Sequence, residues 1–227
     1  MSNLSTASSR AAEGVHLPLM LALTFSTGLI DAVGYLGLDR VFTGNMTGNV
    51  VVLGMALAHA DGLPVAGPVV ALSGFLAGAA IAGSALRGEA AGWSQRTSAI
   101  FACVAVALGT TSGYLLAVDH PPHAAALTVT GLLGTAMGAQ AGTARHLAVK
   151  EVTTVVVTST ITALAAESWF GNRAGAQVPR RGSAVALILL GACTGALLLR
   201  WQLGAAVALA ASITALVAVL GERSRHP

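Results

Sequence analysis

Long apolar segments separated by short polar breaks limit the fold of this chain more than any other feature. Only 9% of its 227 residues are charged, whereas a soluble domain usually has about 25%. A helix that crosses a bilayer needs about 20 mostly apolar residues. We therefore expect an all-α, polytopic membrane helix bundle and exclude an ordinary soluble enzyme. The apolar segments cover residues 17–38, 41–59, 64–86, 97–118, 124–145, 149–169, 183–200 and 203–221.

These segments predict a single membrane domain over residues 16–221. The polar, Ser-rich stretch 1–15 before it is expected to be a disordered tail, and residues 222–227 form a second short tail. The hydrophobic content is rich in Ala, Val and Leu, with many Gly and only 4% aromatics. This composition is typical of closely packed membrane helices.

The distribution of Lys and Arg predicts how many segments cross the membrane. Segments 41–59 and 149–169 are barely long enough to cross and are the most polar. If all eight cross, the twelve basic residues divide evenly between the two sides. If these two enter and return, six helices cross and only Arg40 and Arg200 lie opposite the termini. The ten on the terminal side are Arg10, Arg87, Arg96, Arg145, Lys150, Arg173, Arg180, Arg181, Arg223 and Arg225.

Basic residues accumulate on the cytoplasmic side of membrane proteins. The uneven division therefore favours six spans with both termini in the cytoplasm, plus two short re-entrant or broken segments. Eight full crossings are the alternative.

A weak internal repeat divides the chain into halves of about 16–112 and 123–221. A shift of 111 positions superposes Val41, Thr43 and Thr47 on Val152, Thr154 and Thr158. Three crossings in each half would make the second half inverted, which is a common plan of secondary transporters. Four crossings in each half would make the repeats parallel.

Two groups of residues resemble the YoaK-like family of bacterial membrane proteins, which is defined by a domain of unknown function. The first group is Gly28, Asp31, Ala32, Tyr35, Phe42, Thr47, Gly48 and Asn49. The second is Gly138, Gln140, Arg145, Thr154 and Thr158. The resemblance implies a polytopic inner-membrane protein and supplies no substrate or reaction.

Asp31 is the acid that lies deep within an apolar segment. An ionised carboxylate near the bilayer centre costs about 2.5–3.5 kcal/mol on insertion scales, so such a residue usually faces a cavity or a partner. One interpretation is a carboxylate that couples protons or coordinates a cation. The other is a residue near the end of its span that snorkels or caps the next segment beside Arg40.

Asn45, Thr47 and Asn49 are set among Gly44 and Gly48 in the sequence GNMTGN. Gly44 and Gly48 allow the backbone to leave helical geometry at little steric cost, which would expose polar groups to a ligand. These three side chains are therefore candidate lining residues. Alternatively, the two glycines form a helix packing face of the small-xxx-small kind.

The second half offers a matching polar set. Gln140 is a long amide in an apolar segment and needs hydrogen-bond partners there, while Thr154 and Thr158 share one helical face. These three are candidate substrate or ion ligands. The glycines Gly134, Gly138 and Gly142 are predicted to allow close packing of another helix.

These features predict a small transporter or channel-like permease for a small polar or ionic solute. The alternative is a non-transporting interaction or regulatory protein of the membrane, whose Gly-rich faces bind itself or a partner. No catalytic motif occurs, so we expect no enzyme activity, cofactor or metal site. The expected partners are the lipid bilayer and a small-molecule or ion ligand, with a homo-oligomer as an open alternative. The basic pair Arg180 and Arg181 is too small to predict nucleic-acid binding.

Overall fold

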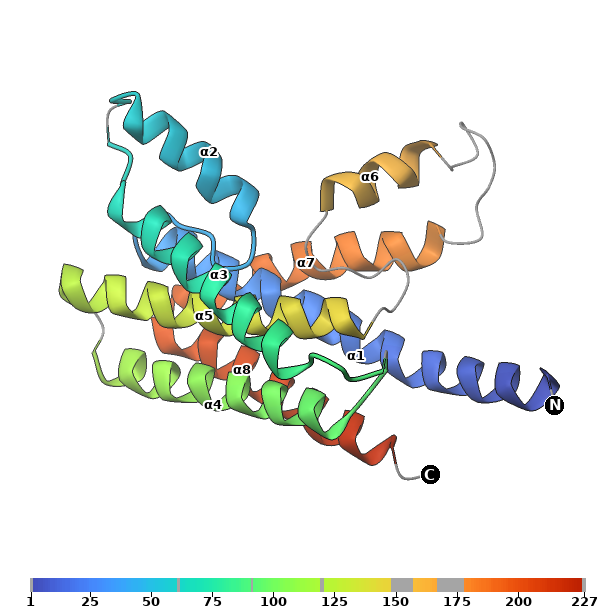
Figure 1. Ribbon diagram of the computed structural model, residues 1–227. Coiled ribbons are helices and arrows are strands. Elements are labelled where there is room, and N and C mark those ends of the chain that lie inside the picture. Colours follow the sequence, from blue (N-terminus) through green and yellow to red (C-terminus); the bar gives the residue numbers. More distant parts are fainter. Residues whose placement is uncertain are drawn as a thin grey trace.

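The computed structural model describes residues 2–60, 62–90, 92–118, 121–147, 157–166 and 178–225, and the regular elements in these ranges are all helices. This confirms the predicted all-α bundle, and each predicted apolar segment overlaps one helix (Figure 1). The helices are α1 (Ser2–Gly37), α2 (Met46–Leu57), α3 (Ala66–Ala85), α4 (Gln95–Ala117), α5 (His123–His146), α6 (Val157–Ala166), α7 (Val178–Leu199) and α8 (Leu203–Arg223).

Five of these helices are long and apolar enough to cross a membrane. They contribute His16–Gly37, Ala66–Ala85, Gln95–Ala117, Gly182–Leu199 and Leu203–Arg223. Helix α5 is also long, with 24 residues or about 36 Å, but it is less apolar. Its polar side chains Thr130, Gln140 and Thr143 are buried against other helices, so they need not face lipid.

The two segments predicted to be short contain short helices. Helix α2 has 12 residues and α6 has 10, which correspond to about 18 and 15 Å. The hydrocarbon core of a bilayer is about 30 Å thick, so neither helix is long enough to cross it. In Figure 1, α2 begins near the middle of the bundle and runs back toward the end at which α3 begins.

Most helix contacts repeat when the first four helices are exchanged with the last four, and the contact between α7 and α8 is the exception. Helix α1 packs on α7 and α3 packs on α5; α1 also packs on α8, as α5 does on α4. Helix α2 packs on α3, as α6 does on α7, and α4 packs on α8. In Figure 1, α1, α4 and α7 run one way along the bundle, and α3, α5 and α8 run the other way.

Helix α1 begins at Ser2 and therefore includes residues 2–15, for which the sequence predicted a disordered tail. Ala11, Ala12 and Glu13 favour helix, and residues 2–15 contain no proline, so the helix can extend before the apolar segment begins.

Glycines bring α3 and α5 into close contact along their lengths. A Cβ atom at Gly74 would lie 2.6 Å from the carbonyl oxygen of Gly131, and one at Gly134 would lie 2.7 Å from that of Ala71. A Cβ at Gly78 would overlap the backbone of Thr135. The two backbones therefore touch at positions where no larger residue fits.

We predict that Gly78→Ala destabilises the protein because the added methyl group forces α3 away from α5. Gly83→Ala on the same helix is the matched control, since a Cβ at Gly83 has no atom within 4 Å. Removing a helical glycine there is expected to stabilise by about 0.5–1 kcal/mol. Thermal unfolding in detergent gives the melting temperatures of both variants and of the wild type. Equal melting temperatures for the two would contradict the close contact.

Candidate functional site

The chain leaves helical geometry between α1 and α2, over residues 38–45. Asp31 of α1 is half-buried and faces this break. Its Oδ1 atom accepts hydrogen bonds from the backbone N–H groups of Thr43 at 2.9 Å and Gly44 at 2.7 Å. The carboxylate therefore satisfies two backbone donors that no helix satisfies.

Asn49, in the first turn of α2, holds the same break from the other side. Its side-chain Oδ1 accepts from the backbone N–H of Phe42 at 2.8 Å, and its Nδ2 donates to the Phe42 carbonyl at 2.5 Å. The side chain is only 1% exposed. Its amide thus pairs with both polar groups of one residue, as a neighbouring backbone strand would.

The two glycines of this region are sites of close approach. The Phe42 ring stacks on Tyr35, with centroids 5.0 Å apart, and covers Gly48, where a Cβ would lie 2.6 Å from the ring. A Cβ at Gly44 would lie 2.7 Å from the methyl group of Thr27. Gly44 therefore lies against α1, and Gly48 lies against Phe42 of the break.

Gln140 of α5 reaches the same region from the second half of the chain. It is 1% exposed, and its Nε2 donates to the hydroxyl of Thr27 at 3.4 Å. Thr27 in turn donates to the carbonyl of Leu23 at 2.9 Å. The Oε1 atom of Gln140 has no hydrogen-bond partner within the described part of the chain. An unsatisfied buried acceptor of this kind costs about 1–3 kcal/mol.

Thr27 connects these groups, because it contacts Gln140 on one side and Gly44 beside Asp31 on the other. We use the name polar cluster for Thr27, Asp31, Thr43, Gly44 and Gln140. The cluster has a single formal charge, that of Asp31, which forms no ion pair with a described residue. Its open hydrogen-bonding position is an acceptor, so it can bind a small group that donates hydrogen bonds.

None of the three predicted lining residues joins this cluster; Asn49 bonds instead to the backbone of Phe42. Asn45 and Thr47 are exposed, whereas Asn49 is buried. The reason is helical geometry: α2 begins at Met46, so residues 47 and 49 are about 200° apart around its axis. Side chains two positions apart share a face in a strand but not in a helix.

The other predicted residues lie elsewhere. Thr154 lies outside the described residues. Thr158 is in α6, but its side chain is outside the described part. Gly134, Gly138 and Gly142 face α3, where added Cβ atoms would meet Ala71, Phe75 and Ala79.

Sequence reasoning missed Thr27 and Thr43. Thr24, Thr27 and Asp31 are spaced as one face of a helix, which is a signal that could have found Thr27. The role of Thr43 depends on its backbone N–H as well as on its side chain, and a backbone donor has no signature in sequence.

The fold and the buried polar cluster are those of a multi-pass helical membrane protein. Residues 19–220 match the family described as protein of unknown function (DUF1275), and the chain belongs to this family. It is similar to the UPF0700 transmembrane protein YoaK of Bacillus subtilis (strain 168), with 32% identity over 151 residues. The match covers 64% of each chain, just under two thirds of YoaK. These findings confirm the predicted YoaK-like resemblance. No solved structure matches the chain.

We predict that Asn49→Asp destabilises the protein by about 1–3 kcal/mol, because the carboxylate has no N–H to donate to the Phe42 carbonyl. Asn45→Asp is the matched control, since Asn45 is exposed on the same segment. Thermal unfolding in detergent at pH 7 compares the two. A melting temperature of Asn49→Asp equal to that of the control would show that the Asn49 amide does not hold the break.

Proposed function

We propose that this protein is a small transporter or channel-like permease of the inner (plasma) membrane for a small polar or ionic solute. The observation that carries the proposal is the buried acceptor of Gln140 beside the break between α1 and α2. A polar group without a partner is costly in an apolar interior. A solute or water that donates a hydrogen bond to Gln140 would remove that cost.

Each residue of the proposed site has a distinct role. Gln140 accepts a hydrogen bond from the solute. Asp31 holds the break through its hydrogen bonds to Thr43 and Gly44. It also gives the region its negative charge, with which it couples protons or coordinates a cation. Thr154 and Thr158, whose side chains lie outside the described part of the chain, stay predicted members of the site. The exposed Asn45 and Thr47 lie on the approach to it.

We further propose two inverted repeats of three spans each, with α5 as the sixth crossing helix. The exchangeable helix contacts support this arrangement, as do the opposite directions of α1 and α5, of α3 and α7, and of α4 and α8 in Figure 1. The uneven division of Lys and Arg supports cytoplasmic termini. Discontinuous segments near the middle of inverted repeats are typical of secondary transporters.

A second candidate is a non-transporting interaction or regulatory protein. Its expected contact faces were the Gly-rich ones, but Gly134, Gly138 and Gly142 contact α3, and Gly191 and Gly195 contact α1. A partner or a further copy would therefore have to use another surface. The exposed side of α2, with Val50 and Val51 each more than half exposed, is the surface that favours this candidate.

We predict that Gln140→Leu lowers solute flux at least about tenfold, because it removes the open acceptor, and a factor of ten corresponds to one ordinary hydrogen bond. Stopped-flow light scattering of proteoliposomes with glycerol, urea, ammonium chloride and potassium chloride measures the flux. Thr130→Val is the matched control, since it removes a different buried, unpartnered polar group on α5, the Thr130 hydroxyl.

Gln140→Leu is expected to fold at least as stably as the wild type, since it removes an unsatisfied group. Flux equal to that of protein-free vesicles for all four solutes would contradict the permease proposal. Equal flux through wild type and Gln140→Leu would keep a permease but exclude the proposed site.

A further inference from the structure

An apolar groove runs along the outside of the bundle between α1 and α8, with α7 at its edge. Its volume is about 950 Å³, at the upper end of the range for ligand pockets, about 300–1,000 Å³. Its walls are almost entirely apolar and mostly aliphatic, with Leu21 of α1, Leu187 of α7 and Leu216 of α8 among them. The α8 side extends over residues 213–224, or about 17 Å.

The groove ends at a basic residue. Arg223, in the last turn of α8, lines it together with Ser224. Arg223 is exposed and forms no ion pair with a described residue, whereas its neighbour Arg225 is paired with Glu222. The guanidinium of Arg223 is therefore free to bind an anion at one end of an apolar channel. The Ser224 hydroxyl donates to the carbonyl of Gly221, so Arg223 supplies the donors.

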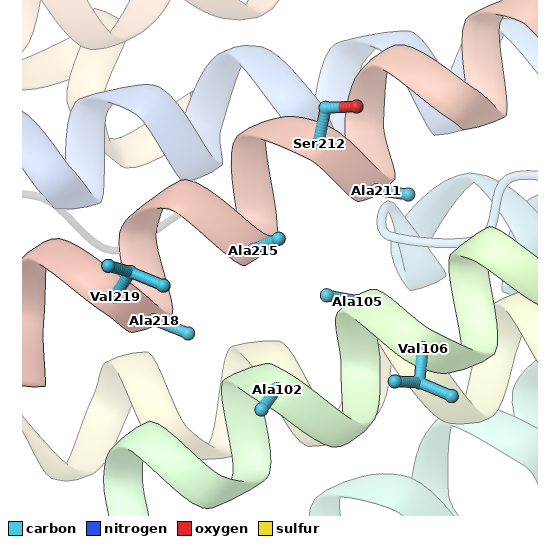
Figure 2. Close-up of a pocket in the computed structure, with 8 residues that line it drawn as sticks. All are labelled: Ala102, Ala105, Val106, Ala211, Ser212, Ala215, Ala218 and Val219. Atoms are coloured by element: carbon cyan, nitrogen blue, oxygen red, sulfur yellow. The ribbon is translucent and has the colours of Figure 1, made fainter.

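Two other grooves on the bundle carry no charged residue. The groove between α4 and α8, about 430 Å³ in volume, is lined by Ala, Val and Ser212 (Figure 2). The groove between α4 and α5, about 340 Å³, has the polar side chains of Thr110, Thr111, Tyr114 and Thr128. Under the helix exchange described above, α4 and α5 correspond to α8 and α1. The groove between α4 and α5 is therefore the counterpart of the groove between α1 and α8, but no charged residue lines it.

We propose that the groove between α1 and α8 binds an anionic phospholipid, with an acyl chain along its aliphatic walls and the headgroup phosphate on Arg223. The shape and length of the groove suit a flexible hydrocarbon chain, and Arg matches a phosphate with parallel N–H donors. Basic pockets between membrane helices bind anionic headgroups in this way. The end of α8 also lies at the same end of the bundle as the start of α1 (Figure 1), where most of the Lys and Arg residues are expected.

Native mass spectrometry of the full chain in detergent tests this site with phosphatidylglycerol and phosphatidylcholine of identical acyl chains. We expect the wild type to retain one phosphatidylglycerol in preference to phosphatidylcholine. Arg223→Gln is expected to lower that preference about fivefold, the effect of one basic residue near anionic lipid, while Arg223→Lys keeps most of it. Leu216→Trp, which fills the groove, is expected to remove retention of the lipid.

Arg200→Gln is the matched control, because Arg200 is an exposed Arg directly after another long helix, α7, outside the groove. Equal retention of the two lipids by the wild type would overturn the proposal. So would an effect of Arg200→Gln as large as that of Arg223→Gln, or unchanged retention by Leu216→Trp. Should Arg223→Gln fail to fold, Arg223→Lys and Leu216→Trp decide the question. The outcome is independent of the flux experiment, since a lipid site requires no transport.

Discussion

The structure depends on how the backbone of residues 42–44 satisfies its hydrogen bonds away from water. In a bilayer, a chain that leaves helical geometry must find partners within the protein. Asp31 supplies an acceptor to two N–H groups, and the Asn49 amide supplies a donor and an acceptor to Phe42. These bonds come from the two helices that flank the break. They fix where α1 ends and where α2 begins, and they bring Thr43 and Gly44 to Asp31 within the polar cluster.

Close backbone contact between helices is the second constraint, and it explains why so much glycine is needed. The pair α3 and α5 and the pair α1 and α7 both meet through glycines such as Gly78, Gly138 and Gly191, where an added Cβ would overlap the partner backbone. Helix association in lipid has little hydrophobic driving force and relies on such packing. Glycines that serve these internal contacts are not available to a partner protein. This leaves the exposed helix faces to lipid.

The helical segments could be predicted because polarity alone marks where apolar helices end, and the short lengths of α2 and α6 follow from the same pattern. The polar cluster could be predicted only in part. Asp31 and Gln140 are conspicuous in apolar segments, but the partners of Asp31 are backbone atoms, which have no sequence signature. The contact between Thr27 and Gln140 joins residues 113 positions apart and is a consequence of tertiary packing. Asn45 and Thr47 were grouped with Asn49 by spacing, and the helical start of α2 separates them.

The central claim is that the break held by Asp31 and Asn49 turns the chain back, so that α2 does not cross the membrane. Labelling of single cysteines with a membrane-impermeant maleimide in sealed vesicles tests it most directly, in a background without the exposed Cys103 and Cys193. Arg40→Cys and Ala60→Cys flank α2, and Arg87→Cys follows α3. The account predicts that Arg40→Cys and Ala60→Cys are labelled from one side and Arg87→Cys from the other. Labelling of Arg40→Cys and Ala60→Cys from opposite sides would show that α2 crosses and would contradict the account.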